Sequence, residues 1–465
     1  MKKRIGIIGG GFSVTMLGRH LIEQQKEKLS VVVYNENEKF AQGVAYNPKS
    51  SKLLLNVVAG KMSAFPDQPN HFVEWCLLNG IGNENSKDLL SGSFLPRLTY
   101  GNYLNDIWKD TQQLAIKNGH GLYSIPEKAQ KIEKLKFNFQ IQSISRIETV
   151  DYLILATGNE LPGNPPIKNL DFFKSNFYQQ NPWQIDFSKV SQEEPILIIG
   201  NGLTMVDTVM ELRENGFQQK IVSVSPNGFN ILPHRNFAFQ YNGPIKDLKE
   251  DKSLLELLGL FNSELKKLHE FGILAEPLID SLRPYVQKIW QSLNLEEKQQ
   301  FMRRLRHLWG VARHRIPFVS YDFIQKERIA NRLEILAGKV VDLKQNENNV
   351  IAHIFDKKSK IEIVVQFSLV INCAGPQTKI DKTGNELLTQ LKKDGLIVQD
   401  ELNLGINVND NYQIIDSNDR IDENMFALGN LLKGKLWEST AINELRVQAK
   451  EIAAFICCDK FGSSE

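Results

Sequence analysis

The sequence predicts an α/β fold, because it contains two strand–turn–helix units of the same kind. Apolar residues 5–8 lead into three glycines at 9–11, and apolar positions with helical spacing follow. Apolar residues 196–199 lead into Gly200-Asn201-Gly202 and a second helical stretch. Such a turn suits dinucleotide phosphates, since the helix N-terminus offers free N–H groups and a positive dipole end. We therefore expect two nested Rossmann-like dinucleotide-binding domains, each a three-layer ββα arrangement, with a helical insertion.

The first unit departs from the usual pattern at two positions. Gly9 permits the tight turn and Gly11 lets a pyrophosphate approach, but Val14 stands where a third glycine normally allows close helix–strand packing. Asn35 ends the next strand, where a carboxylate usually holds a ribose hydroxyl, and Glu36 adjoins it. The candidate dinucleotide contacts here are Gly9, Gly10, Gly11, Phe12, Ser13, Asn35 and Glu36. A glycine turn of an unrelated α/β domain is the alternative interpretation.

The second unit and two glycine-ended strands define the expected domains. The candidate contacts of the second unit are Gly200, Asn201, Gly202, Leu203, Thr204 and, after the next strand, Ser225. Two apolar strands end in Ala156-Thr157-Gly158 and Cys373-Ala374-Gly375, which we interpret as the crossings between nested domains. Residues 245–316 are rich in Leu, Glu and Lys with helical period, which predicts a helical insertion. We expect domains at 1–190, 191–365 and 366–465, of which the first and last form one unit.

Composition excludes several classes of function. The chain has 465 residues, enough for two to four domains, and its formal net charge of +2 gives no case for nucleic acid as a partner. No apolar run approaches the roughly 18 residues of a membrane span, and the start MKKRIGIIGG indicates a strand rather than a signal peptide. The four cysteines form no C-x-x-C pair, so neither a redox dithiol nor a metal site is expected, and they suit the cytoplasm. Cys457 and Cys458 are expected on a buried helix face.

Nearly the whole chain resembles a bacterial family of FAD/NAD(P)-binding proteins. That family belongs to the two-dinucleotide-domain flavoproteins, which include flavin-containing and N-hydroxylating monooxygenases. The resemblance rests on the glycine turns and above all on MSAFPDQPNHF at 62–72 and WESTAINELRVQA at 437–449. It implies FAD on the first unit and NADP, or NAD, on the second. By this resemblance the further cofactor contacts are Met62, Ser63, Thr157, Gly158, Gly375, Gly429, Asn430, Trp437, Glu438 and Ser439.

Coenzyme choice is less clearly marked than the cofactors themselves. The family often has arginine after the second strand of the second unit, where this chain has Ser225-Pro226-Asn227-Gly228. No acidic residue stands there to repel a 2′-phosphate. Family analogy therefore favours NADPH slightly, with Lys220, Ser225 and Asn227 as candidate contacts of that phosphate.

The resemblance implies an FAD-dependent oxidoreductase that uses NAD(P)H, and a monooxygenase acting on a small amine or amino acid is the leading expectation. A flavin reductase or dehydrogenase with another acceptor, a non-catalytic FAD/NAD(P) sensor and a flavin-free dehydrogenase are the alternatives. His71 and Glu438 are candidates for proton transfer. Arg97 and Arg313, the latter within Arg313-His314-Arg315, are candidates for holding a substrate carboxylate. Each of these four residues is equally well explained as structural. The expected partners are a small-molecule substrate and oxygen, and a homodimer stays open.

Overall fold

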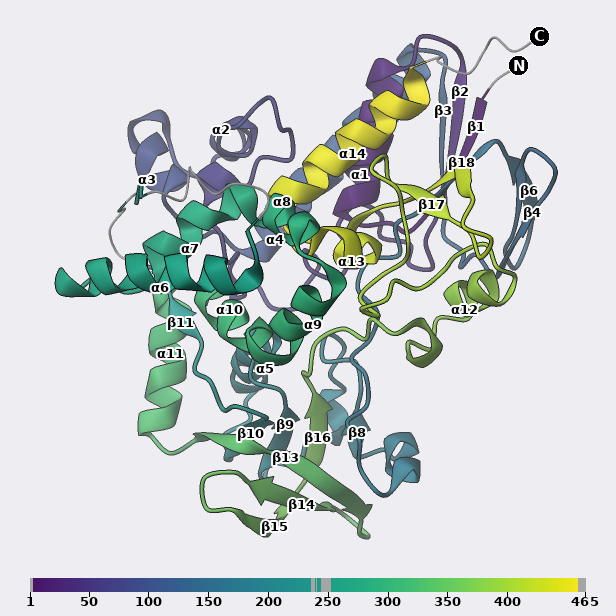
Figure 1. The fold of residues 1–465 in the computed structure, drawn as a ribbon. Helices are drawn as coiled ribbons and strands as arrows, with labels where there is room; N and C mark the ends of the chain where they lie inside the picture. The colour runs from purple at the N-terminus through teal and green to yellow at the C-terminus, as the bar shows by residue number, and fades with distance from the viewer. Residues whose placement is uncertain (1–2, 236–238, 240, 244–251, 459–465) are drawn as a thin grey trace.

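The computed structural model describes residues 3–235, 239, 241–243 and 252–458, which form two large sheets and two small ones with helices around them (Figure 1). The first sheet has the strand order β17-β18-β7-β1-β2-β3, and all neighbours are parallel except β17 and β18. Its strands are β1 (Lys3–Ile8), β2 (Leu29–Tyr34), β3 (Gly121–Ile125), β7 (Tyr152–Leu155), β17 (Gln413–Ile415) and β18 (Ile421–Ala427). The N-terminal and C-terminal parts of the chain therefore share one sheet, as nested domains require.

Helices cover one face of this sheet, and a small three-stranded sheet covers the other. α1 (Phe12–Gln24) packs with α4 (Arg97–Lys117) and α14 (Ile442–Cys457) around one apolar cluster, and α14 lies alongside α1 (Figure 1). The opposite face carries the antiparallel meander β4 (Lys131–Lys134), β5 (Phe139–Gln142) and β6 (Ile147–Val150). A Cβ at Gly6 of β1 would lie 2.4 Å from Cδ1 of Ile141, so the two layers pack closely. The predicted ββα arrangement is confirmed for the first domain.

The second domain is built on a seven-stranded sheet of order β15-β14-β13-β10-β9-β16-β8. Its strands are β8 (Tyr178–Gln179), β9 (Ile196–Ile199), β10 (Ile221–Ser225), β13 (Leu333–Gln345), β14 (Val350–Asp356), β15 (Ile361–Phe367) and β16 (Leu369–Asn372). The pairs from β13 to β8 are parallel, whereas β13, β14 and β15 form an antiparallel meander. α5 (Leu203–Glu214) and α11 (Phe318–Ile329) pack against one face in a separate apolar cluster.

The domain crossings lie where the sequence placed them, but the domain limits differ. Residues 156–158 follow β7 and residues 373–375 follow β16, and the two exits meet in a bridge between Pro162 and Pro376. Both β8 and β16 belong to the seven-stranded sheet of the second domain. By sheet membership, residues 178–179 and 369–372 therefore go with the second domain, whereas the expected limits at 190 and 366 assign them to the first. β8 is two residues long and carries no periodicity, so this limit could not be read from the pattern.

The predicted insertion is helical in its described part, whereas its first residues, 245–251, lie outside the described ranges. Its helices are α6 (Leu254–Glu270), α7 (Glu276–Leu282), α8 (Val286–Ser292), α9 (Leu295–Arg304) and α10 (Arg306–Arg313). Ser253 and Asn294 start α6 and α9 with capping boxes, which satisfy N–H groups of the first turn. The insertion lies beside the short helix α13 (Lys433–Leu436) and the start of α14 (Figure 1).

The remaining helices and strands connect these units. They are α2 (His71–Leu78), α3 (Lys87–Ser91), α12 (Glu386–Lys393), β11 (Leu232–Pro233) and β12 (Arg315–Ile316). Within the described ranges, no helix combines the length and apolarity that crossing a bilayer requires, and no three metal-ligating side chains gather. Cys76 and Cys373 are buried, but Cys457 is half-buried and Cys458 is exposed, so the expected buried cysteine pair is corrected.

Candidate functional site

The first glycine turn is shaped by close backbone approaches. Gly9 has φ +129°, and a Cβ there would lie 2.2 Å from the carbonyl oxygen of Ala156. Gly11 precedes α1 without any side-chain cap, so N–H groups of the first turn stay open to a ligand. Gly43 has φ +58°, and a Cβ there would lie 3.2 Å from Cα of Gly11. The sequence pattern did not single out Gly43 as part of this turn. These close approaches bring the backbone of Gly9, Gly11 and Gly43 together at the N-terminus of α1, where a pyrophosphate would bind.

The two unusual positions of this unit are both accommodated. Val14 is buried against the apolar cluster of the first domain, in van der Waals range of the turn at Gly9. Asn35 donates from Nδ2 to the carbonyl oxygen of Asn37 at 2.8 Å, which closes the loop after β2. The Asn35 side chain also covers Gly10, where a Cβ would meet Cγ at 2.5 Å. Glu36 is exposed. Asn35 is therefore partly a loop-closing residue.

The second glycine turn repeats this geometry. Gly200 has φ +106°, and a Cβ there would lie 2.3 Å from the carbonyl oxygen of Cys373. Gly202 precedes α5 without a side-chain cap, and nothing lies within 4 Å of its Cβ position. Asn201 donates to the carbonyl oxygen of Phe229, while its buried Oδ1 has no partner. Leu203 and Thr204, in the first turn of α5, are half-buried.

The end of β10 is the place where the ribose of a coenzyme on α5 would lie. Ser225 accepts a hydrogen bond at Oγ from N of Gly228 at 3.1 Å, so its hydroxyl shapes the turn, and Asn227 is half-buried in that turn. Lys220 precedes β10 at its opposite end and pairs with Glu334 at 2.6 Å. Lys220 is thereby separated from Ser225 by the length of the strand, and its expected contact with a 2′-phosphate is corrected.

The C-terminal segment reaches the first glycine turn at Gly429 and carries polar groups without hydrogen-bond partners. A Cβ at Gly429, where φ is +79°, would lie 3.6 Å from Oγ of Ser13 and 3.3 Å from Cδ2 of Leu445. Gln448 accepts a hydrogen bond from N of Gly429 at 3.2 Å. Buried polar atoms without a hydrogen-bond partner are Oδ1 of Asn430, Oγ of Ser439 and Nε2 of Gln448. Such orphan groups are costly unless a ligand or water satisfies them. This chemistry fits a polar cofactor bound between the first and last parts of the chain.

Residues 62–72 mostly stabilise their own loop. Met62 is buried in the apolar cluster, and Oγ of Ser63 donates to the carbonyl oxygen of Gln68 at 2.6 Å. Nη1 of Arg446 donates to the carbonyl oxygen of Ser63 at 2.7 Å, which ties the loop to α14. Nδ1 of His71 lies 2.8 Å from Oη of Tyr103, and burial lowers the pKa of His71. The Met62 and Ser63 side chains therefore pack or close a turn, and His71 is a neutral, hydrogen-bonded residue near pH 7.

The insertion is attached to the C-terminal segment through Glu438. Its carboxylate accepts from Nε1 of Trp309 at 3.1 Å and lies 3.4 Å from Nη2 of Arg313. Its backbone oxygen accepts from Nε2 of Gln287. The neighbouring Trp437 stacks on Trp290 with ring centroids 5.1 Å apart. Trp437 thus packs against the insertion, and its expected contact with the flavin stays a prediction. Glu438 and Arg313 bind each other, which leaves neither side chain as a free acid or clamp.

A second pair of charges supports the same contact. Nη2 of Arg283 lies 3.6 Å from Oε1 of Glu444, while Oε2 of Glu444 is buried without a partner. Burial, followed by the charge of Arg313, lowers the pKa of Arg283, and burial raises the pKa of Glu444. Burial also lowers the pKa of His314, whose ring contacts the carbonyl oxygen of Gly310. Arg283 and Glu444 belong to no local motif, so the sequence alone does not mark either residue as functional.

Arg97 lies in a different contact from Arg313. Its Nη1 is 2.9 Å from Oδ2 of Asp207 on α5, and its Nε donates to the carbonyl oxygen of Leu54 at 3.0 Å. Arg97 and Asp207 therefore join the two domains, and the expected carboxylate clamp formed by Arg97 with Arg313 is corrected. Thr157 and Gly158 follow β7, and Gly375 follows β16, where φ values of +77° and +87° at the two glycines turn the chain between domains.

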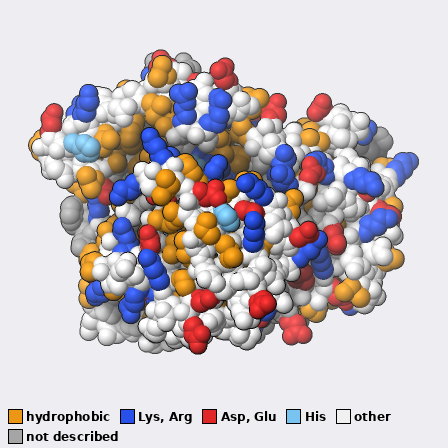
Figure 2. Space-filling model, turned by 90° about the horizontal axis from the view of Figure 1, so that it is seen from below, with side chains coloured by type: hydrophobic (Ala, Val, Ile, Leu, Met, Phe, Trp, Pro, Cys, Tyr) orange, Lys and Arg blue, Asp and Glu red, His pale blue; other side chains and the backbone are white. Residues whose placement is uncertain are grey.

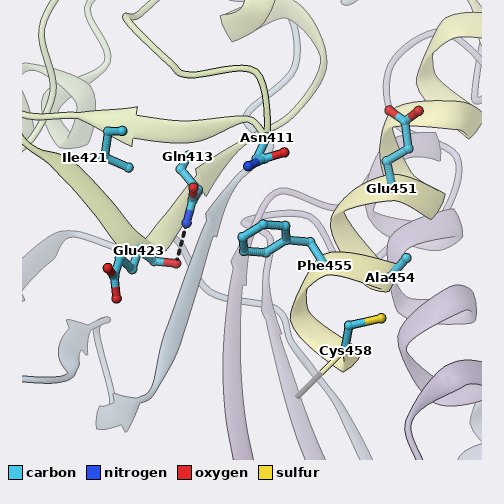
Figure 3. A pocket seen from close by; sticks show the side chains of 8 residues that line it. All are labelled: Asn411, Gln413, Ile421, Glu423, Glu451, Ala454, Phe455 and Cys458. Carbon is cyan, nitrogen blue, oxygen red and sulfur yellow. Dashed lines mark hydrogen bonds between the residues drawn. The ribbon is translucent and has the colours of Figure 1, made fainter. Parts of the chain in front are cut away.

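Two surface cavities lie apart from this contact between the insertion and the C-terminal segment. One, of about 630 Å³, lies between β17, β18 and the end of α14, with Gln413, Glu451 and Phe455 around it (Figure 3). Glu451 there accepts from Oη of Tyr412. The other, of about 760 Å³, lies between α4, the loop after β2 and the end of β3. The face below the second domain mixes basic, acidic and hydrophobic side chains (Figure 2), as the low net charge predicts.

Comparison with known proteins adds to these observations. Residues 6–160 match a family described as FAD-NAD(P)-binding. None of the curated protein sequences matches the chain. The solved structure of ornithine N-hydroxylase from Kutzneria sp. 744, with reduced FAD, NADP⁺ and L-ornithine, has a TM-score of 0.64 at 13% identity, over 98% of this chain and 99% of that one. The solved structure of L-lysine 6-monooxygenase from Pseudomonas syringae has a TM-score of 0.64 at 14% identity, over 98% of both chains. The solved structure of bacillithiol disulfide reductase from Staphylococcus aureus has a TM-score of 0.55 at 12% identity, over 99% of both chains.

The chain has the fold of the two-dinucleotide-binding-domain flavoproteins. In this flavoprotein fold the family match covers the first glycine turn and ends just after β7, so it spans the N-terminal part of the first domain. The structural likeness extends over nearly the whole chain, including the second glycine turn and the C-terminal segment.

Proposed function

We propose that this flavoprotein is an FAD-dependent, NADPH-oxidising enzyme that hydroxylates a small amine or amino acid. The observation that carries the proposal is the fold match over 98% of the chain to an N-hydroxylase described with reduced FAD, NADP⁺ and ornithine. The two uncapped glycine turns and the orphan polar groups of Asn430, Ser439 and Gln448 support it from the chain itself.

Several residues would hold FAD. The N-terminus of α1 and Gly9, Gly10 and Gly11 would take the pyrophosphate, since a helix N-terminus binds anions. Asn430, Ser439 and Gln448 would satisfy their orphan atoms on the flavin. When bound, FAD supplies the redox chemistry with NADPH and oxygen, and the protein supplies binding, orientation and exclusion of water.

The second domain would bind the coenzyme. Gly202 and the first turn of α5 would receive its pyrophosphate, because the Cβ position of Gly202 is open. Gly200 requires its own φ of +106° and contact with Cys373, so it would shape the turn rather than touch the ligand. Ser225 and Asn227 would lie near the ribose. NADPH is preferred to NADH only by analogy with the solved N-hydroxylase.

The insertion would exclude water from the substrate. Trp290, Phe301 and Trp437 form an apolar contact over the segment that carries Glu438 and Ser439. Arg283 and Glu444 are largely buried at this contact, where Oε2 of Glu444 has no hydrogen-bond partner and charges act strongly on a bound molecule. A small charged substrate would bind here, and oxygen would be the second substrate.

A reductase is the second candidate function, because a disulfide reductase shares the fold at a TM-score of 0.55. Buried Cys76 and Cys373 have pKa values raised to about 12 by burial, so they do not suit thiol exchange. The deciding experiment adds single amines and amino acids to the FAD-loaded protein with NADPH in air. Hydroxylated product in proportion to NADPH oxidised supports the monooxygenase. Oxidation that responds only to a quinone or a disulfide contradicts it and supports the reductase.

A further inference from the structure

Helix α5 carries a row of carboxylates on the side that faces the first domain. Asp207, Glu211 and Glu214 have i, i+4 and i+7 spacing and so lie on one face of the helix. Asp207 and Glu211 are only 7% and 6% exposed. Burial raises the pKa of both, against the charges of Arg97 and Lys49 respectively. Buried carboxylates require partners, and in this row the partners come from the first domain.

Arg97 is the partner of Asp207, and backbone carbonyl oxygens of the first domain hold Arg97 in place. Nη1 of Arg97 lies 2.9 Å from Oδ2 of Asp207 as an ion pair, and Nη2 donates to Oδ1 at 3.3 Å, whereas Oδ2 accepts no hydrogen bond. Nε of Arg97 donates to the carbonyl oxygen of Leu54, and N of Arg97 donates to that of Leu53 at 2.8 Å. Counting side-chain atoms alone, Arg97 is 9% exposed and Asp207 is 11% exposed, so both side chains are largely buried.

The other carboxylates of α5 face the same segment of the first domain. Oγ of Ser50 donates to Oε2 of Glu214, and Nζ of Lys52 lies 3.8 Å from Oε1 of Glu214. The charge of Lys49 acts on Glu211. Residues 49–54 and the start of α4 therefore form one basic strip, which we call the docking strip. It contacts Asp207 and Glu214 of the acidic row on α5, and the charge of Lys49 acts on Glu211 between them.

The docking strip contacts the helix that the proposed function assigns to the coenzyme. The N-terminus of α5 would hold the phosphates of NADPH, so the placement of α5 on the docking strip would set the distance between nicotinamide and flavin. Hydride transfer depends steeply on that distance, since an error of about 1 Å costs on the order of 10²-fold in rate. A buried charge pair also disfavours other placements, because each of them leaves a charge unpaired.

We propose that Arg97 and Asp207 are positioning residues that set the two domains in the geometry for hydride transfer. This inference rests on the proposed function. It gives Arg97 a role in the first half of the reaction instead of in binding a substrate carboxylate.

The test combines anaerobic flavin reduction by NADPH with calorimetry of the FAD-free chain. Asp207→Asn should lower the limiting reduction rate by about tenfold or more, while the coenzyme Kd stays within about twofold and FAD content is unchanged. Arg97→Lys should lower the limiting reduction rate less than Asp207→Asn does, because it keeps the positive charge. The double variant that exchanges the two charges, Arg97→Asp with Asp207→Arg, should recover part of the rate. Asp322→Asn is the matched control, because its exposed pair with Lys326 on α11 lies within the second domain.

Equal limiting rates in Asp207→Asn and Asp322→Asn would overturn the proposal. Calorimetry separates this failure from failure of the proposed function. The FAD-free wild type should unfold in one transition and Asp207→Asn in two, because the domains lose their link. If the wild-type flavin is not reduced by NADPH, the proposed function fails, and two transitions would still show that the pair joins the domains. One unchanged transition in Asp207→Asn would overturn that link as well.

Discussion

Arg313 and Glu438 lie on opposite sides of the contact between the helical insertion and the C-terminal segment, with Nη2 of Arg313 3.4 Å from Oε2 of Glu438. Both side chains are largely buried, at 12% and 13% exposed. Trp309 donates to the other carboxylate oxygen of Glu438 at 3.1 Å. Glu438 is thus the anchor of the insertion.

Removing the charge of Glu438 should loosen the insertion. Glu438→Gln leaves Arg313 largely buried without its counter-charge, which we expect to cost about 3 kcal/mol. Hydrogen exchange measured by mass spectrometry should become faster in α10. Glu347→Gln, in the exposed turn between β13 and β14, is the control. The same exchange in both variants would show that Glu438 does not anchor the insertion.

The first glycine turn should not tolerate a side chain at its strained position. Gly9→Ala combines an unfavourable φ of +129° with a Cβ 2.2 Å from the carbonyl oxygen of Ala156. We expect loss of bound FAD, measured as the flavin-to-protein absorbance ratio, and a lower melting temperature. Gly259→Ala in α6 has nothing within 4 Å of its Cβ and should keep both. Full FAD content in Gly9→Ala would refute the role of this turn.

At Gly202 of the second turn, the effect of a side chain's size on coenzyme binding can be measured separately from the effect of its charge. Gly202→Ala should change coenzyme affinity little, because nothing lies within 4 Å of the added Cβ. Gly202→Asp places a negative charge at the N-terminus of α5 and should raise the KM for NADPH by about tenfold or more, through repulsion of the pyrophosphate. Steady-state kinetics at constant FAD content measure both. An unchanged KM in Gly202→Asp would place the coenzyme elsewhere.

Stability should fall in mild acid because of buried histidines. Burial lowers the pKa of His20, His71 and His234 below the usual 6.5. Below about pH 6.5 the unfolded chain therefore binds more protons than the folded one, and stability decreases as pH falls, by at most about 1.4 kcal/mol per pH unit for each group. His71→Gln keeps a hydrogen-bonding side chain beside Tyr103 but does not titrate. Denaturant unfolding between about pH 7.5 and about pH 5.5 should show a shallower dependence for His71→Gln; an identical dependence would contradict this.

The features of the fold that depend on short local patterns could be predicted from the sequence. Both glycine turns, the crossings after residues 156–158 and 373–375 and the helical insertion follow from short apolar runs, glycines and helical period, and the structure has them. Gly9 and Gly200 were identifiable because the tight turns require left-handed φ values that favour glycine.

The partners of the charged residues could not be predicted in the same way. Arg97 and Asp207 are 110 residues apart, and Arg313 and Glu438 are on separate elements that meet only in the folded chain. A basic sequence run therefore suggested a substrate clamp, whereas each arginine already has a carboxylate. Trp437 likewise suggested a ring beside the flavin, but its stacking partner Trp290 belongs to the distant insertion.

The central claim is that the chain binds FAD and reduces it with NADPH, and anaerobic absorbance spectroscopy of the purified protein tests it most directly. We expect a yellow protein that releases FAD, not FMN, on heating and whose visible flavin absorbance is bleached by NADPH without oxygen. A colourless protein that takes up no added FAD, or a flavin that NADPH leaves oxidised, would contradict it.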